Sequence, residues 1–562
     1  MKASDRIVRF LERQGIEYVF GYQGGMITHL VDSLSKSKRV RFVPCYHEQS
    51  AAFAAEGYAR ATGRIGVCLT TSGPGATNTV TSVGNAYFDS VPVLYITGQV
   101  NAYEYKYDKR IRQQGFQETD IVSIARPIAK AVKLADDPTR LMLDLRQLVE
   151  IAISGRKGPV LLDLPMNVQR ADIADGDDAP VKELPLTENL SADGAKEIAS
   201  VFSSANRPLV LCGGGLAKRE VREAARAFLR ESGYPYVVSL MGKGLVDETN
   251  VNCLGMIGSY GNRCANMALA RADVVLALGS RLDLRQTGNR KSELLKNIKF
   301  IRIDVDSSEL EENRLPNQLA FKGDCATFLS SAYARQLKCS QTLWCDFAQS
   351  LKARFSQEND VERFVEKTLP YDIMNRIGSL ATERDDFVVD IGQNQMWAAQ
   401  MLRPNGCQMF LTSGGMAPMG YAVPAAVGMA FANPNRHVYC LCGDGGLHIA
   451  VQSLLLISQY RLPVTVVVFN NQALGMITQF QRLYFDSNMA GTTKDGGYCV
   501  PSFSDLAAAY GLRYSCVTET GGFPRCCRGG ELIEVKLDGL TAVVPKLEFS
   551  KDLNDMTPSI VE

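Results

Sequence analysis

Two loops in the last third of the chain carry the residue types best suited to binding a metal ion and a phosphate group. An apolar run at 438–442 leads into Gly443-Asp444-Gly445-Gly446, and a second run at 463–469 leads into Asn470-Asn471. Asp444 and Asn471 are 27 residues apart, which is enough for one strand–helix–strand crossover, and parallel strands bring such loops to the same sheet edge. Magnesium prefers oxygen ligands completed by phosphate, and helix starts bind phosphate. Gly-Asp-Gly alone is typical of an ordinary turn, but the whole unit predicts a magnesium–diphosphate clamp at Asp444 and Asn471.

The elements that must position these loops are short apolar runs separated by longer amphipathic segments. The runs expected to form buried strands are 67–69, 92–96, 159–164, 208–212, 236–239, 274–278, 300–304, 387–391, 438–442 and 463–469. Continuous apolar runs of this length are typical of parallel sheets covered by helices on both faces. The fold class expected is therefore α/β, with three doubly wound parallel-sheet domains.

Two breaks in this pattern indicate domain boundaries. Residues 172–185 are rich in Asp, Gly and Pro and are typical of a solvated linker, and the charged, helical stretch 338–369 ends at Pro370. We therefore predict domains at 1–171, 190–337 and 370–545.

Composition narrows the class of protein. The 562 residues carry 61 Lys and Arg against 60 Asp and Glu, a net charge of +1, which argues against a nucleic-acid-binding protein. The 15 cysteines are scattered without a paired motif, which predicts a reducing, cytoplasmic setting and no zinc site. Residues 1–15 read as an amphipathic helix with Ile7, Val8, Phe10 and Leu11 inward, not as a signal peptide, and no apolar run is long enough to span a membrane.

Motifs along nearly the whole chain resemble the large catalytic subunit of the acetolactate (acetohydroxyacid) synthase family, which depends on thiamine diphosphate. Gly443-Asp444-Gly445 followed by Asn470-Asn471 is similar to the thiamine-diphosphate signature. The other segments that carry the resemblance are 19–25, 48–78, 116–118, 413–420 and 555–558. The resemblance implies a pyrimidine-binding domain at 1–171, a central FAD-type domain at 190–337 and a diphosphate- and magnesium-binding domain at 370–545. It also implies a homo-oligomer with active sites between two subunits and a possible regulatory small subunit.

The resemblance assigns the central catalytic role to Glu48. A carboxylate in a poorly hydrated pocket can share a proton with N1′ of the aminopyrimidine, which lets the cofactor remove its own C2 proton. Met419 matches the side chain that supports the bent cofactor, and Ala417 matches the carbonyl that holds its amino group. On its own, a Glu in this position is typical of a helix start. We leave open whether the neighbouring His47 faces the cleft.

The same resemblance implies further contacts to the cofactor and the substrate. Ala473 completes the set of metal ligands with Asp444 and Asn471. The residues matched to thiamine diphosphate are Pro74, Asn78, Gly392, Gln393, Asn394, Ala417, Met419, Gly445, Gly446, Gly475 and Met476. Gln117 and Lys130 match positions of the substrate channel, where Lys130 would attract a carboxylate; an ordinary solvated lysine is the alternative.

The central segment resembles the FAD contacts of the same family. Strand ends with Gly and Arg suit a pyrophosphate, and an acidic residue at a later strand end suits a ribose or adenine. The residues concerned are Gly213, Gly214, Gly215, Gly279, Arg281, Asp283, Arg285, Asp304 and Asp324. Because the expected reaction has no net redox change, a flavin there would be structural.

Three departures from the family pattern concern the acceptor pocket. Met26 stands where the family has Ala, Phe480 stands where it has Trp, and Ser259-Tyr260 replaces a Met-His pair near the flavin. We expect an enzyme that decarboxylates pyruvate and adds the two-carbon unit to a second 2-keto acid, with Phe480 shaping the acceptor pocket. The alternatives are a related carboligase that uses another ketone, such as a keto-sugar nucleotide, and a catalytically silent scaffold, against which the intact Glu48 and Asp444 argue.

Overall fold

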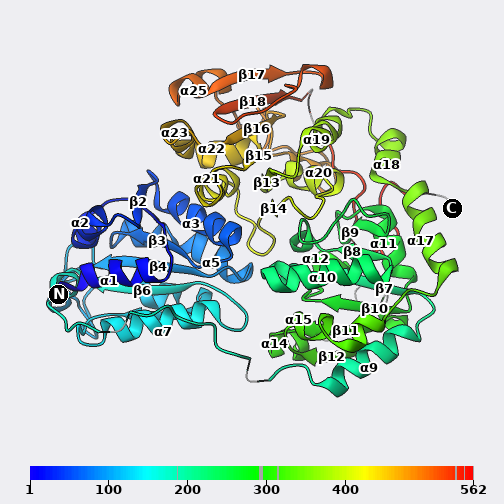
Figure 1. The fold of residues 1–562 in the computed structure, drawn as a ribbon. Coiled ribbons are helices and arrows are strands. Elements are labelled where there is room, and N and C mark those ends of the chain that lie inside the picture. The colour runs from blue at the N-terminus through cyan, green and yellow to red at the C-terminus, as the bar shows by residue number, and fades with distance from the viewer. Residues whose placement is uncertain are drawn as a thin grey trace.

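The computed structural model describes all residues except 177, 187, 290–294, 313–314, 538, 540, 550 and 561–562. Within the described residues, three parallel sheets of six strands each are covered by helices on both faces (Figure 1). The α/β, doubly wound fold predicted from the apolar runs is confirmed. The strands of the three sheets fall within 18–165, 208–322 and 385–536, while the domain limits themselves stay predictions.

The first domain follows the strand order β2-β1-β3-β4-β6-β5. Its strands are β1 (Tyr18–Gly21), β2 (Arg41–Pro44), β3 (Gly66–Thr70), β4 (Val93–Gln99), β5 (Ala131–Leu134) and β6 (Val160–Pro165). Its helices are α1 (Ala3–Arg13), α2 (Thr28–Lys36), α3 (Glu48–Thr62), α4 (Pro74–Thr77), α5 (Val80–Phe88), α6 (Ile121–Ala125), α7 (Leu141–Ile153) and α8 (Met166–Arg170). α1 buries the apolar face predicted for it, including Ile7 and Phe10.

The segment after α8 is exposed over most of its described length, as expected for a linker, but it is anchored at Asp178. Asp178 is 2% exposed and binds both Arg6 and Arg9 of α1. The backbone N–H of Val181 donates to Gln14 at 2.7 Å. Because two arginines on α1 neutralise the acidic stretch, its first part packs against the first domain.

The central domain follows the order β12-β11-β10-β7-β8-β9. Its strands are β7 (Pro208–Cys212), β8 (Tyr236–Val238), β9 (Cys253–Met256), β10 (Val274–Leu278), β11 (Lys299–Asp304) and β12 (Gln318–Lys322). Helices of this part are α9 (Ala192–Ser203), α10 (Arg219–Ser232), α11 (Arg263–Arg271), α12 (Leu284–Thr287), α14 (Ser307–Glu311), α15 (Cys325–Leu329), α16 (Ala332–Gln336), α17 (Thr342–Arg354) and α18 (Gln357–Phe364).

The third domain follows the order β14-β13-β15-β16-β18-β17. Its strands are β13 (Asp385–Val389), β14 (Phe410–Leu411), β15 (His437–Gly443), β16 (Val464–Asn470), β17 (Arg513–Val517) and β18 (Glu531–Lys536). Its helices are α19 (Leu369–Leu380), α20 (Gln393–Met401), α21 (Ala422–Ala432), α22 (Asp444–Ile449), α23 (Leu454–Gln459), α24 (Gly475–Tyr484) and α25 (Phe503–Ala509).

Each sheet has one point where consecutive crossovers reverse direction, and ligands of open parallel sheets bind outside the strand ends at such points. This point lies between β1 and β3 in the first domain, between β7 and β10 in the central domain, and between β13 and β15 in the third. The loops that follow these strands carry most of the residues matched to cofactor positions.

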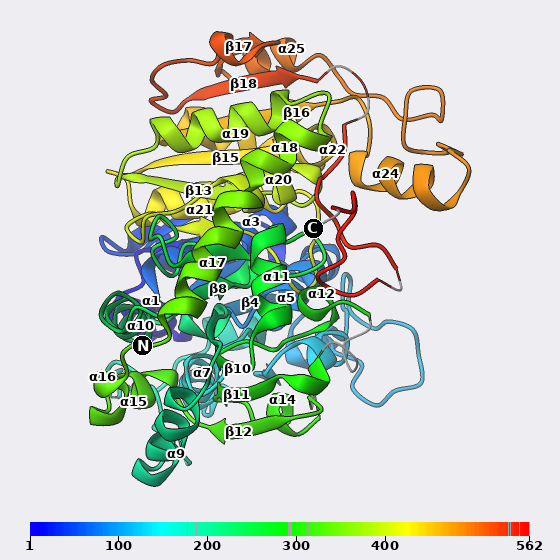
Figure 2. The same ribbon diagram turned by 90° about the vertical axis from the view of Figure 1, so that its right-hand side faces the viewer.

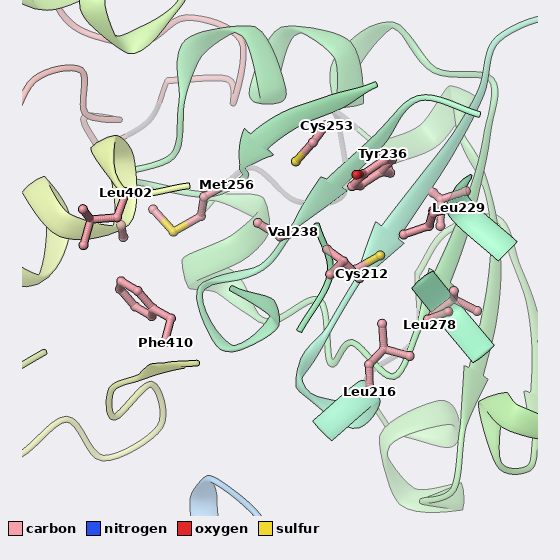
Figure 3. Packing of buried hydrophobic residues seen from close by; sticks show 14 of the residues in the cluster. Cys212, Leu216, Leu229, Tyr236, Val238, Cys253, Met256, Leu278, Leu402 and Phe410 are labelled. Atoms are coloured by element: carbon pink, nitrogen blue, oxygen red, sulfur yellow. The ribbon is translucent and has the colours of Figure 1, made fainter. Parts of the chain in front are cut away.

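The domains are joined by close packing. Helices α3 and α21 touch through glycines: a Cβ on Gly57 would lie 2.1 Å from the Ala425 carbonyl, and one on Gly428 would lie 1.9 Å from the Ala54 carbonyl. Figure 3 shows Leu402 and Phe410 of the third domain beside Met256 of the central sheet, within one continuous apolar core. The C-terminal segment returns across the central domain, where the Leu547 N–H donates to the Ser259 carbonyl. In the part of the chain that the structure describes, none of the helices combines the length and apolar character that crossing a bilayer requires.

Candidate cofactor site

Asp444 lies at the carboxyl end of β15, in the first turn of α22, and is 2% exposed. Its Oδ1 accepts hydrogen bonds from the Gly445 N–H at 2.7 Å and the Tyr498 hydroxyl at 2.9 Å. Its Oδ2 is buried and has no hydrogen-bond partner among the described residues. Burial raises the pKa of this carboxyl to about 6, against the opposing effects of the Tyr498 hydroxyl and of the backbone N–H groups of Gly445, Gln472 and Ala473. A buried carboxylate oxygen without a partner is costly, and a cation would satisfy it.

The second predicted loop is folded around Asn471. The Asn471 Oδ1 accepts the Ala473 N–H at 3.1 Å, and its Nδ2 donates to the Gln393 Oε1 at 3.3 Å. A Cβ on Gly475 would lie 2.1 Å from that same Gln393 oxygen. Gln393, which is far in sequence from Asn471 and Gly475, therefore meets them at the carboxyl edge of the third sheet.

The donor set at this edge suits magnesium better than a transition metal. The described residues contain no cluster of three or more His, Cys, Asp or Glu side chains that could hold a metal ion. A cation at Asp444 would depend on one carboxylate together with amide, carbonyl and phosphate oxygens. Magnesium accepts such a shell, because it is commonly held by one or two carboxylates and by substrate phosphates.

Asp390 is a functional candidate that the sequence reasoning missed. It follows β13 directly, is fully buried, and accepts hydrogen bonds from the N–H groups of Gly420 at 3.0 Å and Ala422 at 2.9 Å. A Cβ on Gly446 would lie 2.9 Å from its Oδ1. Asp390 thus holds the loop of Met419 against the start of α22. Its place inside the apolar run 387–391, as the one charged residue of an expected buried strand, was the available signal.

The loop before α21 brings Met419 to the Gly-Asp-Gly turn. The Met419 methyl carbon lies 3.0 Å from the position that a Cβ on Gly445 would take. Ala417 adopts a left-handed conformation with φ of +56°, and its N–H donates to the Ser413 hydroxyl at 3.0 Å. Two residues predicted to hold the cofactor, Met419 and Gly445, are therefore in contact, on a loop with a fixed bend.

Glu48 occupies the first turn of α3, at the carboxyl edge of the first sheet. Its Oε2 accepts a hydrogen bond from the Asn78 Nδ2 at 2.9 Å, and its Oε1 lies 3.3 Å from the position of a Cβ on Gly75. His47 is the N-cap of α3, and its ring nitrogen Nδ1 accepts the Gln49 N–H. His47 therefore caps the helix, and whether it also faces the cleft stays open. Glu48, Asn78 and the Pro74 turn are brought together.

Gln117 also reaches this turn. A Cβ on Gly73 would lie 2.9 Å from the Gln117 carbonyl oxygen, and Gln117 itself has a left-handed φ of +63°. The next residue, Glu118, holds the loop by accepting the N–H groups of Lys106, Gln114 and Gly115. The buried Glu118 carboxylate therefore fixes Gln117 beside Pro74.

Comparison with known proteins agrees with this geometry. Residues 1–124 match the model of the N-terminal TPP binding domain of thiamine pyrophosphate enzymes, residues 195–332 match the central domain, and residues 390–525 match the C-terminal TPP binding domain. The chain is 33% identical over 546 residues to the acetolactate synthase isozyme 1 large subunit of Escherichia coli, covering 96% of this chain and 94% of that one.

Two further relatives also match this chain over most of both lengths. The acetolactate synthase large subunit of Corynebacterium glutamicum is 33% identical, with 99% of this chain and 85% of the relative covered. That of Lactococcus lactis is 34% identical, with 91% and 87% covered. The chain belongs to the thiamine pyrophosphate enzymes. Within this family it is an acetolactate synthase-like enzyme that forms carbon–carbon bonds, and its cofactor is thiamine diphosphate.

In this thiamine pyrophosphate enzyme, Phe480 lies on α24 with 39% of its surface exposed. Its ring packs 4.8 Å from Tyr484 and 6.1 Å from Phe549 of the C-terminal segment, centroid to centroid. Figure 2 shows α24 beside this segment on one side of the molecule. The neighbouring Gln479 accepts a hydrogen bond from Gln393 at 3.2 Å. The position of Phe480 as an acceptor-pocket residue stays a prediction.

Lys130 lies away from the other predicted residues of this enzyme. It immediately precedes β5, and so lies at the amino edge of the first sheet, whereas Glu48 lies at the carboxyl edge. Its ammonium group donates to the carbonyls of Ile151 and Ser154, and burial lowers its pKa to about 8. Within one chain the lysine caps the end of α7, and its role in a substrate channel stays a prediction.

The central domain of this enzyme has the strand order typical of dinucleotide-binding folds. Gly213 and Gly215 follow β7 and pack directly on Gly279 after β10: a Cβ on Gly213 would lie 2.2 Å from the Gly279 carbonyl oxygen. Asp283 caps α12 by accepting the Arg285 N–H at 3.0 Å and pairs with Arg281 at 3.4 Å.

The remaining predicted flavin residues lie at neighbouring strand ends and turns. Asp304 ends β11, and burial raises the pKa of its carboxyl. Asp324 caps α15, accepting the Ala326 N–H at 2.8 Å. Gly214 lies beside Met241, where a Cβ would meet that side chain at 3.1 Å. The glycines and Asp304 meet at the carboxyl edge, while Asp324 is engaged as a helix cap.

Proposed function

We propose that this enzyme decarboxylates pyruvate and transfers the two-carbon unit to a second 2-keto acid, giving acetolactate. The observation that carries the proposal is the buried Oδ2 of Asp444, which has no hydrogen-bond partner among the described residues. It lies beside the point between β13 and β15 where the crossovers of the third sheet change direction. A carboxylate kept in that state fits a cation that holds a diphosphate. Relatives named acetolactate synthase large subunit support the choice of reaction.

The third domain would hold the metal and the diphosphate. Asp444, Asn471 and the carbonyl of Ala473 would bind magnesium. Residues that would contact the diphosphate are Gly392, Gln393, Asn394, Gly446, Gly475 and Met476, which lie at the starts of α20, α22 and α24. The free N–H groups of helix starts favour phosphate oxygens.

Thiamine diphosphate, when bound, supplies a thiazolium carbon that adds to the keto acid and accepts the electron pair released with carbon dioxide. The role we assign to Glu48 is to hold and share the proton at N1′ of the aminopyrimidine. Asn78 donates to Glu48 at 2.9 Å and so fixes the carboxylate for this task. Met419, Ala417 and Pro74 would pack around the cofactor and exclude water, and Gln117 would contact the substrate.

A complete site requires a second copy of the chain in this proposal. The hydrogen bonds of Glu48 within the described residues stay in the first domain, and those of Asp444 stay in the third. Large apolar side chains of both domains remain exposed, including Phe88 at 41% and Phe116 at 79% in the first domain and Met416 at 44% in the third. Exposed apolar groups of this kind mark association surfaces. We propose a homo-oligomer in which Glu48 of one chain acts with Asp444 of another, and a regulatory small subunit as a further partner.

FAD is the third cofactor that we propose, bound at the β7 and β10 ends of the central sheet. The strand order and the backbone contact between Gly213 and Gly279 support it, because side-chain-free strand ends allow a pyrophosphate to approach. The purified protein should be yellow and release about one flavin per chain on denaturation. Arg281→Ala should weaken flavin retention by about tenfold, as expected for loss of one charge-assisted contact.

The matched control for the flavin experiment is Arg219→Ala, since Arg219 is an exposed arginine of the same domain that pairs with Glu223. It should retain flavin like the parent. Flavin absorbance of the protein fraction after gel filtration measures retention in both variants. A colourless protein that takes up no FAD on incubation would exclude the flavin site.

Phe480 should set the acceptor preference. Its ring replaces the larger tryptophan of the family, and one methylene in a pocket is worth only about 1–3 kcal/mol. We therefore expect little preference for 2-ketobutyrate over pyruvate in the parent. Phe480→Trp should shift this ratio while leaving the rate of pyruvate decarboxylation unchanged. The measurement is a competition between the two keto acids with both products quantified.

The control for this competition is Leu483→Met on the exposed face of α24, which should keep the parental ratio. A strong parental bias toward the 2-ketobutyrate product would show that Phe480 does not govern acceptor choice. If neither keto acid accepts the two-carbon unit, the second candidate, a carboligase for another ketone, becomes the better assignment. The substitutions at Met26 and Phe480 favour that candidate.

The experiment that tests the proposed function is a single incubation. Purified protein, thiamine diphosphate, magnesium, FAD and pyruvate are combined, carbon dioxide is followed, and the product is identified. Acetolactate in a ratio of about one per two pyruvates consumed is expected. Carbon dioxide release without a carbon–carbon bond, or no release at all, would contradict the proposal.

A further inference from the structure

Tyr498 contacts the Asp444 carboxylate although it is 54 residues away in sequence, and neither motif includes it. Its hydroxyl donates to the Asp444 Oδ1 at 2.9 Å. The Gly445 N–H donates to that same oxygen at 2.7 Å. Two donors therefore converge on Oδ1, whereas Oδ2 has no hydrogen-bond partner among the residues that the structure describes.

This arrangement selects one rotamer of the carboxylate. An aspartate held by a backbone N–H alone can still rotate about its terminal bond, because that torsion is broad. A second donor on the same oxygen restricts this rotation. The Tyr498 hydroxyl also lies 3.1 Å from the position of a Cβ on Gly445, so the phenol packs directly on the turn.

The segment that carries Tyr498 is tied to α24. The Tyr498 N–H donates to the Thr493 carbonyl at 2.8 Å, and the Thr492 hydroxyl donates to the Gln481 side chain at 2.7 Å. The Leu474 N–H, just before α24, donates to the Thr492 carbonyl at 3.0 Å. Hydrogen bonds, together with the peptide link between Thr492 and Thr493, thus connect Asp444 through Tyr498 to the helix that bears Phe480.

We propose that Tyr498 is a positioning residue that presents the Asp444 Oδ2 to the metal and couples metal binding to the order of residues 490–498 and α24. The inference rests on the proposed magnesium site and adds the residue that orients its carboxylate. Groups that orient metal ligands typically change metal affinity by about 10–100-fold when they are removed.

The test uses Mn²⁺ as the probe, because its free ion is counted directly by electron paramagnetic resonance. Full-length protein is titrated in saturating thiamine diphosphate. Tyr498→Phe keeps the ring and removes only the hydroxyl, and it should weaken Mn²⁺ binding about tenfold or more. Asp444→Asn, which removes the ligand charge, should abolish binding in the measurable range.

The matched control is Tyr107→Phe, because Tyr107 also donates its phenol to an aspartate, Asp136 at 3.1 Å, but does so in the first domain. This variant should bind Mn²⁺ like the parent. If Tyr498→Phe also binds like the parent while Asp444→Asn does not, the positioning role fails and the metal site stands. If Asp444→Asn binds like the parent, the metal site itself fails.

The coupling has its own readout, the hydrogen exchange of the amides at 490–498. Mn²⁺ with thiamine diphosphate should slow this exchange in the parent and leave it unchanged in Tyr498→Phe. Equal protection in both proteins would contradict the coupling. If Tyr498→Phe folds poorly, the rise in its unfolding temperature with Mn²⁺ still reports affinity, and a rise equal to that of the parent would overturn the proposal.

Discussion

Asp444→Ala should abolish turnover and reduce magnesium affinity by more than about 100-fold, since outer-shell partners alone cost 10–100-fold. The variant removes the only carboxylate among the three proposed metal ligands, and Asn471 and Ala473 offer neutral oxygens alone. Retention of thiamine diphosphate should fall with it, because the diphosphate would be held largely through the metal. Isothermal titration of cofactor and magnesium together measures the loss.

The fold should survive this change. The Oδ2 atom is a buried oxygen without a hydrogen-bond partner in the described structure. Its removal relieves the free-energy cost of that burial, which offsets the loss of the two hydrogen bonds from Gly445 and Tyr498 to Oδ1. We expect the free energy of unfolding without ligands to change by about 1 kcal/mol or less. Asp505→Ala, at an exposed aspartate of α25, is the control and should bind both ligands normally. Parental cofactor affinity in Asp444→Ala would show that the clamp is wrongly placed.

Glu48→Gln should slow exchange of the cofactor C2 proton by at least about 10²-fold, as is typical for loss of an acid–base group. The amide has the same shape and can still accept the hydrogen bond from Asn78, so the loop and cofactor binding should stay close to those of the parent. What it loses is the negative charge that shares the N1′ proton. The effect should therefore appear in kcat and proton exchange more than in cofactor affinity.

NMR of the acid-quenched cofactor after transfer to deuterium oxide measures this exchange. Glu17→Gln changes an exposed glutamate of the first domain in the same way and should exchange at the parental rate. Exchange in Glu48→Gln that is as fast as in the parent would remove Glu48 from the mechanism.

The features that could be predicted from sequence are those that follow from the order of apolar and polar residues within a single strand or helix. The apolar run before Asp444 identified a buried strand, and parallel strands bring the loops after them to one edge, so the approach of Asn471 to the cofactor edge could be expected. The contact between Asn471 and Gln393 places the loops after β16 and β13 side by side at that edge. The buried face of α1 could also be predicted from the sequence, because its apolar residues recur with the helical period of 3.6 residues.

Other features depend on tertiary contacts that no local pattern encodes. Asp390 looks like an ordinary strand end until the N–H groups of Gly420 and Ala422 are seen to converge on it. Tyr498 follows a segment without apolar periodicity, and its contact with Asp444 arises from the path of the loop after α24. The anchoring of the linker after α8 at Asp178 also depends on tertiary contacts, because its two partner arginines lie more than 160 residues earlier.

The central claim is that Glu48 and Asp444 act on one cofactor from two different chains. Mixing Glu48→Gln with Asp444→Ala chains, after dissociation and reassociation, tests it directly. A mixed dimer then contains one site with both residues intact. Random reassociation should restore about a quarter of the parental acetolactate-forming activity, since half of the dimers are mixed and each has one intact site. Activity no higher than that of either variant alone, with mixed dimers demonstrated by mass spectrometry, would contradict the account.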